Sequence, residues 1–132
     1  MERASKGRIL LGEDDPDQIE VLSELLELEG FEVLVARNAR QVVEQLTFHP
    51  GAVLLDLHGV TDPSVFSMLE TLVPHPAVIL LSADANLSEF ARRVGADAFL
   101  EKPYDVGELL GILAVALEGT ALVQEALATI SA

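Results

Sequence analysis

Short apolar runs alternate with amphipathic segments five times along this chain, and this alternation constrains the fold more than any other feature. The apolar runs predict strands at residues 8–12, 31–35, 52–55, 77–81 and 98–100. The helical patterns between and after them begin at capping residues, namely Asp15, Asn38, Asp62, Asn86 and Asp105. Five strand–helix units in 132 residues predict one α/β domain, a doubly wound five-stranded parallel sheet with helices on both faces.

Charged residues follow three of these predicted strands directly. Glu13 and Asp14 come after the first strand, Asp56 ends the third, and Lys102 follows the fifth. Parallel strands bring their carboxyl ends to one edge of the sheet, where such folds bind their ligands. Clustered carboxylates attract a hard divalent cation, and a lysine among them can meet an anion. The pattern therefore predicts a phosphate-accepting, Mg²⁺-dependent site at this edge.

Composition excludes several other classes of protein. The chain has no cysteine, so disulfides and thiol chemistry are ruled out, and its three scattered histidines lack zinc-site spacing. A net charge of −14 argues against direct contact with nucleic acid or an anionic membrane. Residues 1–8 lack the apolar region of a signal peptide, and no apolar stretch approaches the roughly 20 residues that span a bilayer. We therefore expect a cytoplasmic protein.

The motifs stand in the order found in the receiver domain of two-component response regulators, which the chain resembles over residues 8–118. The resemblance rests on five elements in sequence, namely Glu13-Asp14, Asp56, Ser82-Ala83, Phe99 and Lys102-Pro103. It implies a flavodoxin-like (βα)5 fold with strand order 2-1-3-4-5. Residues 1–118 would form the receiver domain, and residues 119–132 a C-terminal tail that we expect to be helical.

The resemblance also implies where phosphate and metal bind. Asp56 would be the phosphoryl acceptor. Asp14, Asp56 and the backbone carbonyl of His58 would ligate Mg²⁺ directly, and Glu13 would bind it directly or through water. Lys102 would pair with Asp56 or with its phosphate.

A switch is implied beside this site. Ser82 and the backbone amide of Ala83 would hold phosphoryl oxygens, and Phe99 would turn inward when Ser82 moves toward the phosphate. The Lys102-Pro103 peptide bond would be cis. The loop after Asp56 departs from the family pattern, because Val60 and Ser64 stand where proline and glycine are usual. We therefore expect residues 57–63 to follow their own path.

The expected function is that of a phosphoprotein in a phosphorelay, a signalling domain that assists its own phosphoryl transfer and dephosphorylation rather than an enzyme. Its partners would be a histidine kinase or histidine phosphotransfer protein and a downstream protein target, with no nucleic acid and no membrane. One alternative is a pseudo-receiver that binds proteins without being phosphorylated. A flavin-binding protein of the same fold is disfavoured by the scarcity of aromatic residues, 5% of the chain.

The fifth helix carries an uncharged apolar run at residues 109–117. Such a run is apolar most of the way round a helix, so part of it needs a cover beyond the sheet. We expect either the tail to fold back, or a homodimer to form through the fifth helix and the tail. The tail would contribute an apolar stripe of Leu122, Val123, Leu127 and Ile130.

Overall fold

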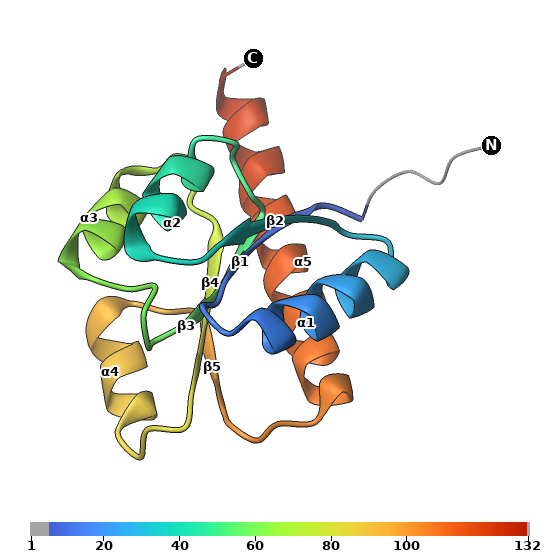
Figure 1. Cartoon of the computed structure of the whole chain (residues 1–132). Coiled ribbons are helices and arrows are strands. Elements are labelled where there is room, and N and C mark those ends of the chain that lie inside the picture. The colour runs from blue at the N-terminus through green and yellow to red at the C-terminus, as the bar shows by residue number, and fades with distance from the viewer. Residues whose placement is uncertain (1–5, 132) are drawn as a thin grey trace.

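All five strands run parallel in one sheet of order β2-β1-β3-β4-β5 (Figure 1). The structure is a computed structural model that describes residues 6–131, with side chains described to Gly119. The strands are β1 (Arg8–Gly12), β2 (Glu32–Ala36), β3 (Ala52–Asp56), β4 (Ala77–Ser82) and β5 (Ala98–Glu101). The helices are α1 (Pro16–Leu28), α2 (Ala39–Leu46), α3 (Pro63–Thr71), α4 (Leu87–Val94) and α5 (Val106–Ser131). The predicted fold class and strand order are confirmed.

Helices cover both faces of the sheet, and the alternation of side chains along each strand supplies both cores. Leu10, Val53 and Leu55 point to the face where α2, α3 and α4 pack. Ile9, Leu11 and Leu54 point to the opposite face, which α1 and α5 cover. The separation of α1 and α5 from the other three helices is visible in Figure 1. The central strands are therefore apolar over residues 9–12 of β1 and 52–55 of β3, as burial on both faces requires.

The caps at the helix starts behave as the sequence predicts in all but one case. Asp15, Asn38 and Asp62 each accept a hydrogen bond from a backbone N–H in the first turn of their helix. The prediction for Asn86 was wrong, because its side chain makes no capping hydrogen bond to α4. Its backbone is not extended there, with φ −97° and ψ 17°, and an extended backbone is what normally lets an N-cap side chain reach back to the helix.

The loop after β3 follows a path set by Val60, which is fully buried between the sheet and α2. Its Cγ2 lies 3.4 Å from the position that a Cβ on Gly12 would occupy. Leu55 crowds the same position from the other side, so a side chain at residue 12 would displace its neighbours. The apolar residue in place of a loop proline thus serves as core packing against the end of β1.

The last helix is longer than predicted. We expected a helix to about Glu118 followed by a separate one, but α5 is continuous to Ser131. Leu109 and Leu113 are buried against the sheet, whereas Val115 on the outer side is 72% exposed. The sheet therefore already covers this part of the apolar run. The predicted apolar stripe of the tail, Leu122, Val123, Leu127 and Ile130, lies outside the described side chains.

Candidate functional site

Three charged side chains from three different strand ends meet at one edge of the sheet. The chain leaves β1 at Glu13, whose backbone N–H bonds to the Ala36 carbonyl at the end of β2. Asp56 is the last residue of β3. Lys102 follows β5 and is fixed by a backbone hydrogen bond from its N–H to the Ser82 carbonyl, 2.8 Å. The parallel register thus delivers two carboxylates and one ammonium group to the same place.

Both carboxylate oxygens of Asp56 are engaged, although only 5% of the residue is exposed. Oδ1 accepts a hydrogen bond from the backbone N–H of His58 at 2.8 Å, and Oδ2 accepts one from the Lys102 ammonium. Burial by itself lowers the pKa of the Lys102 ammonium, but the hydrogen bonds and negative charges of Asp56 and Glu13 together raise that pKa by more, so it is raised overall. The carboxylate is therefore buried, oriented and paired with a cation.

Glu13 is the second buried acid of the cluster, and 2% of it is exposed. Its Oε1 accepts from Lys102 at 3.3 Å, and its Oε2 accepts from the backbone N–H of Asp14 at 3.0 Å. Burial raises the pKa of the Glu13 carboxyl, and the neighbouring charge of Asp56 raises it further, while Lys102 opposes both. Two buried acids thus share one ammonium group.

Asp14 is exposed beside this cluster, and its carboxylate lies against the loop that follows β3. A Cβ at Gly59 would stand 2.4 Å from Asp14 Oδ2, so a side chain there would force the Asp14 carboxylate to move. Gly59 also has φ +85°, which favours glycine independently. Within the described part of the chain, no three His, Cys, Asp or Glu side chains converge closely enough to hold a metal ion by themselves.

The residues predicted for the switch line the neighbouring strand ends. Ser82 is fully buried at the end of β4, and its hydroxyl accepts a hydrogen bond from the Asp84 backbone N–H at 3.0 Å. Ala83 is exposed beside it, and Phe99 on the edge strand β5 is 38% exposed. The Lys102-Pro103 peptide bond is cis, and a second cis bond joins Val73 to Pro74.

Two residues of the site were missed by reasoning from the sequence. Gln18 was not among the predicted site residues, yet its Oε1 lies 2.8 Å from the Lys102 ammonium. Gly59 was passed over, although it borders Asp14. The signal for Gln18 was its place one turn into the helix that begins at the acidic cluster. The contact of Gly59 depends on the path of a loop, which no local pattern specifies.

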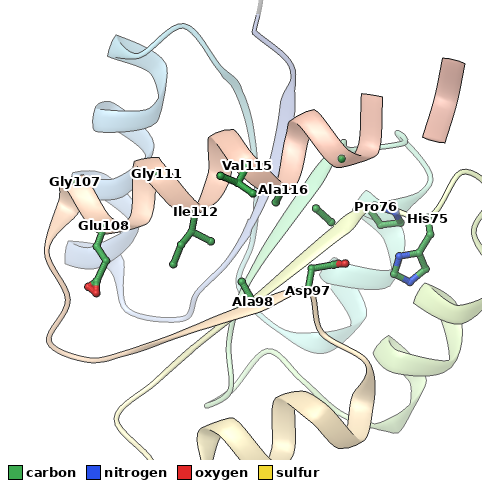
Figure 2. A pocket seen from close by; sticks show the side chains of 12 residues that line it. His75, Pro76, Asp97, Ala98, Gly107, Glu108, Gly111, Ile112, Val115 and Ala116 are labelled. Atoms are coloured by element: carbon green, nitrogen blue, oxygen red, sulfur yellow. The ribbon is translucent and has the colours of Figure 1, made fainter. Parts of the chain in front are cut away.

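A larger cavity of about 740 Å³ lies away from this cluster, between α5 and the starts of β4 and β5. Figure 2 shows Ile112 and Val115 of α5 on one side, and Asp97 with His75 on the other. None of the described residues that line it belongs to the charged cluster. Its lining is mostly apolar, and no lysine stands beside its acidic residues Asp97 and Glu108 among the described residues that line it.

Comparison with known proteins identifies the family. Residues 9–114 match the response regulator receiver domain. The CpxR transcriptional regulatory protein of Klebsiella pneumoniae is 32% identical over 106 residues, 78% of this chain and 46% of that protein. The C4-dicarboxylate transport transcriptional regulatory protein DctD of Pseudomonas aeruginosa is 34% identical over 123 residues, 89% of this chain and 27% of that protein. The chain thus spans less than half the length of these curated relatives.

Solved structures agree with this match. A CheY-like response regulator receiver domain protein from Methanospirillum hungatei is 28% identical, with a TM-score of 0.76 over 89% of this chain and 98% of that chain. The signal receiver domain of an HD domain-containing protein from Pseudomonas fluorescens is 25% identical, with a TM-score of 0.80 over 95% and 96%. This chain belongs to the response regulator receiver domain family, the phosphoacceptor domains of two-component signalling.

Two of the expectations about partners concern nucleic acid and the membrane. The curated relatives are named as transcriptional regulators, so they give no support to the expectation that nucleic acid is not a partner. Among the described residues, no helix is both long enough and apolar enough to cross a membrane.

Proposed function

We propose that Asp56 is the residue of this receiver domain that accepts the phosphoryl group. The supporting observation is its setting: a buried carboxylate at the end of a central strand, held at one oxygen by the His58 N–H and at the other by Lys102. A carboxylate of this kind can act as a nucleophile toward phosphorus. A surface aspartate that only capped a loop would have no reason to be paired with a lysine 46 residues away.

The reaction exchanges one bond to phosphorus for another. A carboxylate oxygen of Asp56 forms the new O–P bond while the P–N bond of a phosphohistidine breaks, and the imidazole, which carries a proton on its other ring nitrogen, keeps the electron pair and leaves as the neutral base. Phosphoryl transfer depends mainly on positioning and on neutralising charge. Lys102 contributes the positive charge that this chain itself supplies, and the backbone N–H of His58 keeps the carboxylate oriented.

Mg²⁺ fits the oxygen donors at this edge. Asp14, Asp56 and the backbone carbonyl of His58 would hold it, and Glu13 would reach it directly or through water. Two carboxylates and a carbonyl suit an ion that prefers hard oxygen ligands and keeps several waters. The glycine at position 59 supports the assignment, because it leaves room for the Asp14 carboxylate where any side chain would collide with it. The bound ion would supply positive charge opposite the phosphoryl oxygens.

Ser82, Ala83 and Phe99 would report the phosphorylation to the rest of the domain. In the structure the Ser82 hydroxyl faces the Asp84 N–H and Phe99 is partly exposed. A phosphoryl group on Asp56 would give the Ser82 hydroxyl and the Ala83 N–H a stronger acceptor, because hydrogen bonds to charged oxygens exceed those between neutral groups. Movement of Ser82 would free the space into which Phe99 turns.

The domain would act as a signalling component in the cytoplasm that helps to catalyse its own phosphorylation and dephosphorylation. Its partners would be a histidine kinase or a histidine phosphotransfer protein, and a downstream protein. A homodimer through α5 and the tail would give the exposed face of α5, where Val115 projects, an apolar cover. The assembled cluster of Asp56, Glu13 and Lys102 favours the phosphoacceptor over a pseudo-receiver.

The test is phosphorylation of the purified chain by a small phosphodonor in the presence of Mg²⁺, followed by intact-mass spectrometry. We expect the mass of one phosphoryl group on the wild type and none on Asp56→Asn. Asp62→Asn is a matched control, because Asp62 caps α3 a few residues further along the same loop. Equal labelling of the wild type and Asp56→Asn would rule out the proposed acceptor.

A further inference from the structure

The Lys102 ammonium has three hydrogen-bond acceptors, each from a different part of the fold. Asp56 Oδ2 comes from β3, Glu13 Oε1 lies 3.3 Å away just after β1, and Gln18 Oε1 lies 2.8 Å away in the first turn of α1. An ammonium group has three donors. Each of the three donors therefore has an acceptor. Two of these acceptors are carboxylates, and the third is a neutral amide.

The Gln18 amide is itself held in the orientation that Lys102 needs. Its Nε2 donates to Asp15 Oδ2 at 3.4 Å, and Asp15 caps α1 by accepting from the Asp17 backbone N–H. A reversed amide would set an NH₂ group against the ammonium and an oxygen against a carboxylate, which is unfavourable at both ends. The start of α1 thus fixes an acceptor in place for Lys102.

We propose that Gln18 is a positioning residue for Lys102, a role that rests on the proposed function of Asp56. The two carboxylates that bind the ammonium are also the groups whose charge environment changes when a divalent cation binds or when Asp56 becomes an acyl phosphate. The Gln18 oxygen is neutral and takes part in neither event. It anchors Lys102 beside Asp56 while the other two contacts change, and so keeps the ammonium within reach of the phosphoryl oxygens.

The first test observes Lys102 directly in the unphosphorylated, Mg²⁺-free protein. The chain has only two lysines, Lys6 and Lys102, so ¹⁵N-lysine labelling gives two ammonium signals that Lys6→Arg assigns. We expect a Lys102 signal protected from exchange in the wild type. Gln18→Met, which keeps the length but removes the acceptor, should broaden or shift this signal, and Gln18→Glu should retain it. An unchanged Lys102 signal in Gln18→Met would overturn the proposal.

The chain supplies a matched control for this substitution. Gln41 lies three residues after the cap of α2, as Gln18 lies three residues after the cap of α1, and its Oε1 accepts from the Arg37 backbone N–H instead of a lysine. Gln41→Met therefore removes a first-turn glutamine without touching Lys102. It should leave the Lys102 signal as in the wild type, and a Lys102 shift equal to that in Gln18→Met would also overturn the proposal.

The second test measures phosphorylation with phosphoramidate as the donor. Gln18 also borders a groove of about 320 Å³ with Tyr104 and Val106, and a small donor separates positioning from docking of a protein there. We expect Gln18→Met to lower the maximal phosphorylation rate roughly tenfold with an unchanged half-saturating donor concentration. A defect in half-saturation alone, or no defect, would overturn the positioning role. Failure of the wild type to be phosphorylated would instead refute the function of Asp56 and leave the ammonium signal to decide on Gln18.

Discussion

The charged cluster at the carboxyl edge of the sheet and the cavity beside α5 are opposites in construction. The cluster is small, and its buried acids Glu13 and Asp56 share one ammonium group that draws on three parts of the fold. The cavity has a volume of about 740 Å³, a lining that is mostly apolar, and three helix glycines, Gly107, Gly111 and Gly119. The proposed function belongs to the cluster and not to the cavity, because phosphoryl transfer needs oriented charges.

This contrast makes the cluster the place where single substitutions should have large effects. A buried charge is tolerated only while it is paired. Removing one partner therefore leaves the other charge buried without compensation, which destabilises the fold. An open apolar cavity has no such dependence, and changes there should be mild.

Removal of the shared cation should be the most damaging change. Lys102→Ala leaves Glu13 and Asp56 buried and facing each other, which we expect to lower stability at pH 7 by as much as about 3 kcal/mol. The loss should shrink as the pH falls and the carboxyls take up protons. Thermal melts at pH 7 and pH 5 check this, with Lys6→Ala as the control for an exposed lysine. Equal destabilisation at both pH values would contradict the explanation from charge.

A side chain at Gly59 should weaken Mg²⁺ binding. Gly59→Ala forces a Cβ to within 2.4 Å of Asp14 Oδ2 and adds backbone strain of about 1–2 kcal/mol at positive φ. We expect Mg²⁺ affinity, measured by calorimetric titration, to fall about tenfold as Asp14 is displaced. Gly95→Ala is the matched control, because it has φ +73° and nothing within 4 Å of the added Cβ. Equal Mg²⁺ affinity in the two variants would mean that Asp14 is not a ligand of the metal.

The titration of Glu13 should appear in the pH dependence of stability. Its pKa in the fold is raised above the ordinary value of 4.5, so its protonated form is favoured in the fold and stability is lost as the pH rises through the raised pKa. Glu13→Gln does not titrate. In metal-free buffer, the melting temperature of this variant relative to the wild type should therefore climb as the pH is raised above 4.5 and through the raised pKa of Glu13. A difference that stays flat over this range would mean that the pKa of Glu13 is not raised.

The smallest effect should come from the cavity. A Cβ at Gly111 would meet nothing within 4 Å, so Gly111→Ala should only improve the helix, by about 0.5–1 kcal/mol. Denaturant melts check the gain, and the phosphorylation rate should not change. Light scattering on the same variant tests the proposed homodimer. A drop in mass from dimer to monomer would show that a second chain occupies this face. A substitution in the cavity would then have a large effect after all.

The amino-acid sequence was enough to predict which elements form and which charged residues meet. Five apolar runs and their helix caps specify a parallel α/β sheet, because a strand buried on both faces must be apolar throughout. Once the sheet is parallel, residues that follow the strands share one edge, so Glu13, Asp56 and Lys102 could be placed together without coordinates. The continuous α5 was missed, because Gly119 suggested an end to a helix that passes through it.

How those charges are held depends on contacts between elements that are far apart in the chain. The third acceptor of Lys102 comes from Gln18, on a helix 84 residues earlier in the chain, and the space for Asp14 comes from a glycine in a loop. Both contacts depend on how α1 and the loop after β3 pack around the sheet edge. The burial of Val60 fixes that loop, and its neighbours Leu55 and Gly12 lie on two different strands. Local patterns specify elements, but hydrogen bonds between elements are set by packing, since distances of a few tenths of an ångström decide whether they form.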